Sequence, residues 1–104
     1  MTSDLTVVFK ALSDKTRREL LTQVCQQGPC RVTDLASHYQ MSLNGVSKHL
    51  KILEKAQLIK RSTIGREHWI HANLESVNSI EQWLNELKSI WLLSLDQLEN
   101  QIGK

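Results

Sequence analysis

The sequence contains few residues that interrupt regular structure, with one proline and four glycines among 104 residues. It also lacks a long hydrophobic run. The longest largely apolar segment, residues 90–95, is far shorter than the roughly 20 residues that a membrane-spanning helix requires. The apolar stretch between Asp4 and Lys10 is too short for a secretory signal. We therefore expect a mostly helical chain that is not a membrane protein.

Cysteine is scarce as well, since Cys25 and Cys30 are the only two. Without an export signal, two cysteines indicate reduced thiols in a cytoplasm and not a disulfide framework. Hydrophobic residues make up 40% of the chain and charged residues 23%, which is typical of a folded domain and not of a disordered tail. Residues 1–104 are expected to form one domain, whose small core favours self-association.

The net charge of +2 is unevenly distributed along the chain. Residues 1–72 carry eleven Lys and Arg against six Asp and Glu, a net +5, whereas residues 73–104 carry two against five, a net −3. Residues 48–66 alone hold six basic side chains against one acidic side chain, again a net +5. Positive charge concentrated in one stretch is expected of a nucleic-acid binder, although a solvated basic face would have the same composition.

Capping residues mark the start of three helices in the first half of the sequence. Short polar side chains at these positions accept hydrogen bonds from the free N–H groups of a helix's first turn. The expected caps are Ser13 or Asp14, Thr33 or Asp34, and Ser42. Apolar residues recur at helical spacing after each cap, and also in a first helix before residue 13.

The order of these segments predicts a winged helix-turn-helix. Residues 33–57 read as two short helices joined by a few residues, which is the helix-turn-helix pattern. Residues 58–71 read as two strands joined by a tight turn at Gly65, and a hairpin in that place is a wing. The expected fold class is mostly α with a small β-hairpin, followed by a long C-terminal dimerisation helix over about residues 74–102.

That last helix carries a stripe of apolar side chains three or four residues apart, close to a heptad repeat. The stripe consists of Val77, Ile80, Leu84, Leu87, Trp91, Leu95, Leu98 and Ile102, and Trp83, Ile90 and Leu92 widen it. An ordinary core helix is the simpler interpretation, but so small a domain has little surface to cover so long a face. We therefore expect a homodimer whose interface contains Val8, Leu12, Ile80, Leu84, Leu87, Trp91, Leu95 and Leu98.

The fourth helix has one apolar and one polar side when it is drawn at about 100° per residue. The apolar side holds Leu43, Val46, Leu50 and Leu53, and the opposite side holds Asn44, Lys48, Lys51 and Lys55. Asparagine can pair with adenine, and lysine can reach guanine or phosphate. Gly45 costs up to about 1 kcal/mol relative to alanine in a helix, which suggests close approach to a DNA backbone. Ile52 also falls on the polar side, without an explanation from the sequence.

Several segments resemble the ArsR/SmtB family of bacterial winged-helix repressors. They are residues 11–18 (ALSDKTRR), 32–36 (VTDLA) and 46–54 (VSKHLKILE), together with Gly65-Arg66. The resemblance implies a homodimer in which residues 42–51 read the major groove of double-stranded DNA and the wing around Arg66 touches the minor groove or the backbone. The residues expected to contact DNA are Ser42, Asn44, Gly45, Ser47, Lys48, His49, Lys51, Arg61 and Arg66.

Many relatives in that family sense metals, and their sites can be compared with this sequence position by position. One family site uses a Cys-x-Cys pair before the third helix, where this chain has Arg31 and Thr33. Another uses Asp and His on the C-terminal helix, but residues 72–104 contain no His and no Cys. His68 and His71 point to opposite faces of a strand and are poor joint ligands. We expect no metal effector and no cofactor, and the small-molecule effector is unknown.

The two cysteines leave an alternative open. Cys25 and Cys30 flank a turn that could bring them together, and Arg31 would lower the pKa of the Cys30 thiol. Equally, both could be small buried hydrophobic residues. Enzyme motifs are absent from the sequence, so no catalysis is expected. The sequence predicts a homodimeric repressor on an inverted-repeat operator, with a thiol-redox-responsive repressor or a winged-helix protein-interaction module as alternatives.

Overall fold

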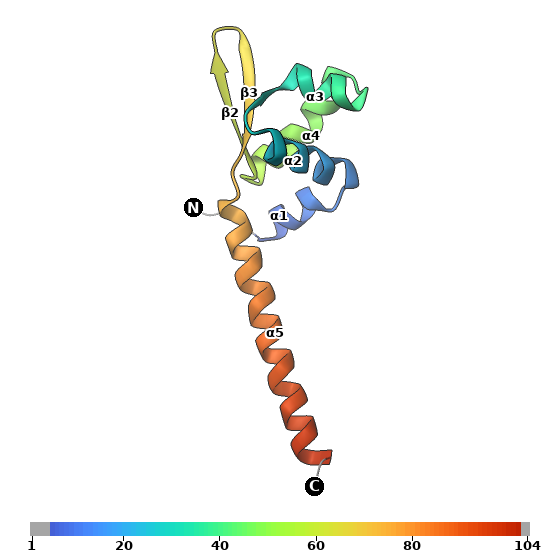
Figure 1. Ribbon diagram of the computed structural model, residues 1–104, viewed down its shortest axis with the longest axis vertical. Helices are drawn as coiled ribbons and strands as arrows, with labels where there is room; N and C mark the ends of the chain where they lie inside the picture. Colours follow the sequence, from blue (N-terminus) through green and yellow to red (C-terminus); the bar gives the residue numbers. More distant parts are fainter. Residues whose placement is uncertain (1–4, 103–104) are drawn as a thin grey trace.

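A computed structural model describes residues 5–102 as a mostly helical body from which one long helix extends (Figure 1). The elements are α1 (Leu5–Leu12), α2 (Lys15–Gln27), β1 (Cys30–Arg31), α3 (Val32–Tyr39), α4 (Leu43–Lys55), β2 (Ile59–Ile64), β3 (Glu67–Ala72) and α5 (Glu75–Ile102). This order confirms the winged helix-turn-helix fold, with α3 and α4 as its two helices and β2–β3 as its wing. Asp4 lies outside the described residues.

The sheet has one strand more than the sequence predicts. Its strands are ordered β1-β3-β2, and all neighbours are antiparallel. In the short β1, Cys30 pairs with Ile70 and Arg31 with Trp69. The wing turns at Gly65, whose φ of 64° lies in the left-handed region that glycine adopts without steric cost. β1 therefore ties the start of α3 to the wing.

Two of the expected helix caps are present, and one is wrong. The Asp14 side chain accepts a hydrogen bond from Arg17 N at 3.0 Å at the start of α2. Ser42 Oγ accepts one from Gly45 N at 3.0 Å at the start of α4. In contrast, α3 begins at Val32, so that neither Thr33 nor Asp34 is its cap. Pairing of β1 with β3 fixes the backbone up to Arg31, and the helix starts directly after it.

One hydrophobic core lies between α1–α4 and the sheet. Its fully buried large side chains are Leu20, Leu35, Leu50, Leu53, Leu58, Ile59, Ile70, Val8, Val24 and Val46. At the other end, hydrogen bonds hold the start of α5 to this body. Ser76 Oγ lies 3.1 Å from both the Ala56 and the Gln57 carbonyl oxygens, and Asn73 Nδ2 donates to the Gln57 carbonyl at 3.2 Å.

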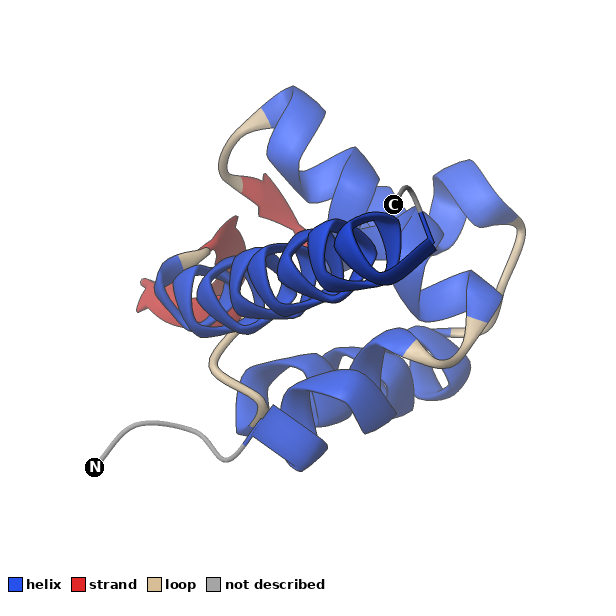
Figure 2. Ribbon diagram, turned by 90° about the horizontal axis from the view of Figure 1, so that it is seen from below, coloured by secondary structure: helices blue, strands red, loops and turns tan. Residues whose placement is uncertain are grey.

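Beyond its first turns α5 leaves the body (Figures 1 and 2). Ile80 is its one buried residue, and every described residue from 81 to 102 is exposed. The radius of gyration is 18.8 Å, whereas a compact domain of this length has about 13 Å. The extended shape therefore comes from a helix with an uncovered apolar face.

Within residues 5–102, no helix is both long enough and apolar enough to cross a membrane.

Candidate nucleic-acid interface

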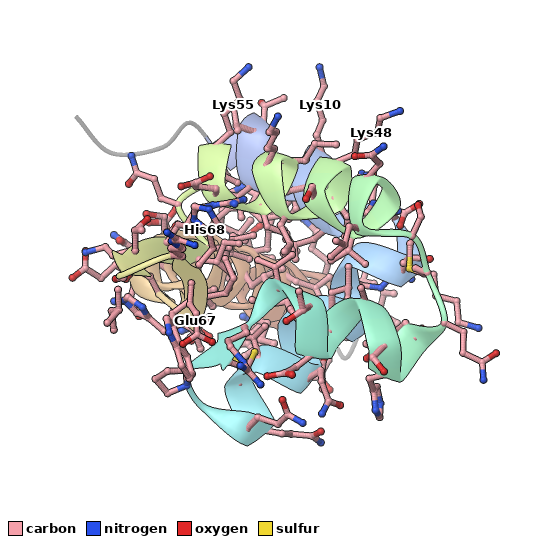
Figure 3. The ribbon with its side chains drawn as sticks, turned by 90° about the horizontal axis from the view of Figure 1, so that it is seen from above. Lys10, Lys48, Lys55, Glu67 and His68 are labelled. Atoms are coloured by element: carbon pink, nitrogen blue, oxygen red, sulfur yellow. The ribbon has the colours of Figure 1, made fainter. Side chains whose placement is uncertain are left out.

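α4 has the two-sided character that its sequence predicts, except that Leu43, expected on the buried side, is 52% exposed at the start of the helix. Val46, Leu50 and Leu53 are 0% exposed and anchor the helix in the core. The residues on its opposite side are all exposed, namely Asn44, Lys48, Lys51 and Lys55. In Figure 3, Lys48 and Lys55 project away from the protein on the same side. α4 thus presents one amide and three cations to solvent from a rigid base.

The wing lies against one flank of α4. Arg61 Nε on β2 is 3.6 Å from Glu54 Oε1 on α4, and the Arg61 side chain is only 24% exposed. A cavity of about 320 Å³ between α3, α4 and the wing is lined in part by Ser47, Arg61 and Arg66. The structure therefore brings together three of the predicted DNA contacts. Arg66 is exposed beside the turn, whereas Arg61 is held toward α4.

The other flank of α4 faces the corner between α1 and α2. His49 Nδ1 lies 3.9 Å from Asp14 Oδ2, and the His49 side chain is 24% exposed. Its Nδ1 is buried and has no hydrogen-bond partner in the described part of the chain. Most of the His49 side chain is therefore turned toward α2 and away from the basic face. Ile52, 41% exposed, falls between Lys48 and His49 around the helix, on this same flank.

Gly45 has a reason within the protein itself. A Cβ at this position would lie 3.2 Å from Ser42 Oγ, the atom that caps α4. That hydroxyl already accepts the Gly45 N–H at 3.0 Å, so a larger residue would crowd the cap. The close approach inferred from the sequence is thus made by the protein's own capping residue.

Arg31 forms a charged link that the sequence analysis missed. Its guanidinium lies 3.1 Å from Asp34 in the first turn of α3 and 2.6 Å from Glu67 on β3. Hydrogen bonds to Glu67 and then Asp34 hold the pKa of Arg31 above its ordinary value. The same guanidinium lies 6.0 Å from the ring centre of Trp69. Arg31 therefore joins the helix-turn-helix to the wing.

The possible metal ligands are dispersed in this structure. Within residues 5–102, no group of three or more His, Cys, Asp and Glu side chains is placed to hold a metal ion. His68 Nδ1 instead lies 3.4 Å from Thr63 Oγ1 across the wing. Arg31 stands at one of the positions compared with the family's Cys-x-Cys pair. Its guanidinium forms ion pairs with Asp34 and Glu67.

The two cysteines are free thiols in different surroundings. Cys25 is exposed in α2, and Cys30 is 5% exposed in the core. Burial, and secondarily the charge of Asp34, raises the pKa of the Cys30 thiol. The prediction that Arg31 lowers this pKa is therefore wrong, because the Arg31 guanidinium is paired with two carboxylates.

The predicted dimer face is partly corrected. Val8 and Ile80 are 1% and 8% exposed and belong to the core of the protomer, so they offer little surface to a partner. Leu12 also packs partly buried against the core. Five of the predicted residues are exposed, namely Leu84, Leu87, Trp91, Leu95 and Leu98. Phe9 and Trp83 add to them, because their rings meet edge to face at 5.7 Å and join α1 to α5.

A recognition helix with a buried apolar side and a free basic side, flanked by a β-hairpin, defines a winged helix-turn-helix protein of the DNA-binding type. Residues 14–61 match the family model described as "Bacterial regulatory protein, arsR family". An arsenical resistance operon repressor of Bacillus subtilis (strain 168) is 39% identical over 72 residues, which cover 69% of each chain. The chain belongs to the ArsR family.

Other relatives agree with this assignment. The transcriptional repressor SdpR of Bacillus subtilis (strain 168) is 32% identical over 77 residues, which cover 74% of this chain and 84% of that protein. An ArsR-like transcriptional regulator from Rhodococcus sp. RHA1 has a TM-score of 0.82 at 28% identity, over 94% of this chain and 92% of that one. A homodimeric winged helix-turn-helix DNA-binding domain from Mycobacterium bovis, 22% identical, shares the fold with a TM-score of 0.66 over 82% and 78% of the two chains.

Proposed function

We propose that this ArsR-family protein is a transcriptional repressor that binds an inverted-repeat operator as a homodimer and has no metal effector. The observation that carries the proposal is the free polar side of α4, where Asn44, Lys48 and Lys51 lie opposite fully buried leucine and valine side chains. Two relatives of the chain are named as repressors. We expect the protein to act in the cytoplasm, where bacterial DNA lies.

Base reading is assigned to the exposed side of α4. Asn44 and Lys48 are both exposed on this side, and we expect Asn44 to pair with adenine and Lys48 to reach guanine acceptors or phosphates in the major groove. Arg66, at the tip of the wing, contacts phosphate or the minor groove. Arg61 and Ser47 line the cavity between these two parts, so they support the position of the wing as well as any contact of their own.

A second copy of the chain is the proposed cover for the apolar face of α5. Leu84, Leu87, Trp91, Leu95 and Leu98 are 39–62% exposed in the protomer. Burial of apolar surface of this kind contributes roughly 25 cal/mol per Å². The solved Mycobacterium bovis domain is described as homodimeric. A two-fold dimer predicts half-sites about one helical turn apart, or a multiple of that.

We propose that the protein has no metal effector because Arg31 and Thr33 stand at the positions compared with the family's Cys-x-Cys pair. A guanidinium engaged with Asp34 and Glu67 places positive charge where a thiolate ligand would have to stand. We expect the purified protein to contain no stoichiometric metal, and zinc or arsenite to leave its DNA affinity unchanged. Tight metal binding that releases DNA would contradict this part of the proposal.

The operator can be found by incubating the purified protein with fragmented genomic DNA and sequencing the bound fraction. The expected result is a small set of fragments that share an imperfect inverted repeat. The Asn44→Ala variant should recover the same fragments less selectively, because it keeps the lysines but loses a base-reading amide. A bound fraction without a shared motif, for the wild type as for the variant, would contradict sequence-specific binding.

A further inference from the structure

α4 is held from both flanks, and only the wing flank has a proposed role toward DNA. On the other flank, the corner between α1 and α2 approaches α4 through Asp14 and His49, 3.9 Å apart. Lys10 lies in the last turn of α1, directly before this corner. It belongs neither to the helix-turn-helix nor to the wing.

Lys10 points in the same direction as the lysines of α4. Figure 3 shows Lys10, Lys48 and Lys55 projecting from one side of the molecule, with Lys10 coming from α1. Lys10 is exposed, and no ion pair within residues 5–102 involves it. Lys15, five residues further along, differs because its Nζ lies 4.0 Å from Glu19 Oε1. The basic face of α4 thus continues onto α1.

The backbone that carries Lys10 is fixed. Its carbonyl oxygen accepts hydrogen bonds from Ser13 Oγ at 2.7 Å and from Arg17 Nη2 at 3.0 Å. Arg17 Nε also donates to the Ala11 carbonyl at 2.7 Å. Positive charges at the C-terminal end of α1 interact favourably with the helix dipole. Their side chains can also donate hydrogen bonds to the free carbonyl groups of the last turn. Val8 and Ala11 are buried in the core on the inner side of the same helix.

We propose that Lys10 contacts a DNA phosphate, so that the DNA-binding surface extends from α4 onto α1. The inference rests on the proposed function. α1 also carries Phe9, which contacts Trp83 of α5 at the edge of the proposed dimer face. Lys10 therefore lies on the side of α4 nearer the dimer axis, and the wing lies on the other flank. The phosphate that Lys10 contacts is in the central part of the operator, between the two half-sites.

The test compares Lys10→Ala with Lys15→Ala, which removes an equal charge from the neighbouring helix. Lys10→Ala should weaken binding about equally on operator and random DNA, and the slope of log affinity against log salt should fall in magnitude by about one. Lys15→Ala should leave the slope unchanged. Phosphate-ethylation interference should lose a central contact with Lys10→Ala and an outer contact with Arg66→Ala.

Failure of this inference differs from failure of the proposed function. If Lys10→Ala keeps the wild-type slope and interference pattern while Lys48→Ala loses operator affinity, the α1 contact is wrong and DNA binding through α4 stands. If the wild type itself binds DNA without salt dependence, both are overturned. Far-ultraviolet circular dichroism of each variant confirms that the exposed substitution leaves the helices intact.

Discussion

The body of the protein buries most of its apolar side chains, whereas the outer part of α5 exposes its own. In the part of the chain that the structure describes, the buried hydrophobic residues lie between Val8 and Ile80, whereas residues 81–102 are exposed throughout and include two tryptophans and several leucines. The body is complete as a fold, because its helices and sheet cover one another. The outer part of α5 has no such cover within the described residues, and the proposed function assigns that cover to a second copy of the chain.

Charge also divides the molecule, close to the start of α5. Residues 1–72 have a net charge of +5 and residues 73–104 a net charge of −3. A phosphate backbone attracts the first region and repels the second, over distances of about a Debye length, or 8 Å at physiological salt. This division matches the proposed function, in which the body contacts DNA and α5 contacts a second copy of the chain.

The strongest way to break this division is to charge the apolar face of α5. The double variant Leu87→Glu/Trp91→Glu should sediment as a monomer, because both side chains face outward in the protomer, 44% and 62% exposed. Loss of one of two linked half-site contacts should weaken operator binding about 10²–10⁴-fold. Gln82→Glu/Ser89→Glu adds the same charge on the opposite side of the helix and should remain dimeric. A charged-face variant that stays dimeric would remove the assignment.

The same substitution in the two regions should have unequal effects on stability. Leu50 is 0% exposed in the body, and Leu50→Ala should lower the free energy of unfolding by about 2–5 kcal/mol. Leu93 is 63% exposed and off the apolar stripe, so Leu93→Ala should change it by no more than about 0.5 kcal/mol. Urea denaturation at one protein concentration measures both. Equal losses would mean that α5 packs more extensively than the protomer shows.

Within the body, the two cysteines should react at different rates. Iodoacetamide should modify exposed Cys25 at least about tenfold faster than Cys30, whose burial limits access and raises the pKa of its thiol. The two rates should converge in denaturant. Diamide should leave operator affinity unchanged. An affinity that shifts with diamide in the wild type, but not in Cys25→Ser, would instead support the thiol-responsive repressor.

A smaller effect should appear in acid, where the Asp14 cap titrates. The hydrogen bond from Arg17 N, with lesser help from the charges of Arg17 and His49, holds the pKa of Asp14 below its ordinary value. Its charge therefore adds stability above the ordinary pKa of about 3.9, and this is lost as the pH falls through the lowered value. Asp14→Asn keeps a capping side chain, so the difference from wild type should shrink in acid. A difference in stability that stays constant with pH would show that the charge of Asp14 does not contribute to stability.

The parts of the structure that follow local rules could be predicted from the sequence. The caps at Asp14 and Ser42, the turn at Gly65 and the two sides of α4 each depend on residues close together in the chain. The ends of α3 and α4 are harder to predict from the sequence. Gln40 and Gln57 take φ values of 54° and 60° there, where glycine or asparagine is usual.

The parts that depend on distant contacts could not be predicted. Arg31 meets Glu67, 36 residues away, and a two-residue strand such as β1 has no periodicity to detect. The helical pattern predicts that His49 contacts DNA, but it cannot show that Asp14 lies beside His49. In the same way, the apolar spacing in the first and last helices cannot show which residues the body covers, so the sequence predicts Val8 and Ile80 in the dimer face although they belong to the core.

The central claim is that α4 reads sequence while the wing holds the backbone, and salt-dependent affinities of three variants on operator and random DNA test it most directly. Asn44→Ala and Lys48→Ala should each lose about 1–3 kcal/mol on the operator and little on random DNA. Arg66→Ala should weaken binding to both DNAs alike and lower the salt slope by about one. Equal losses for all three variants on both DNAs would contradict the account, because α4 would then not be a sequence reader.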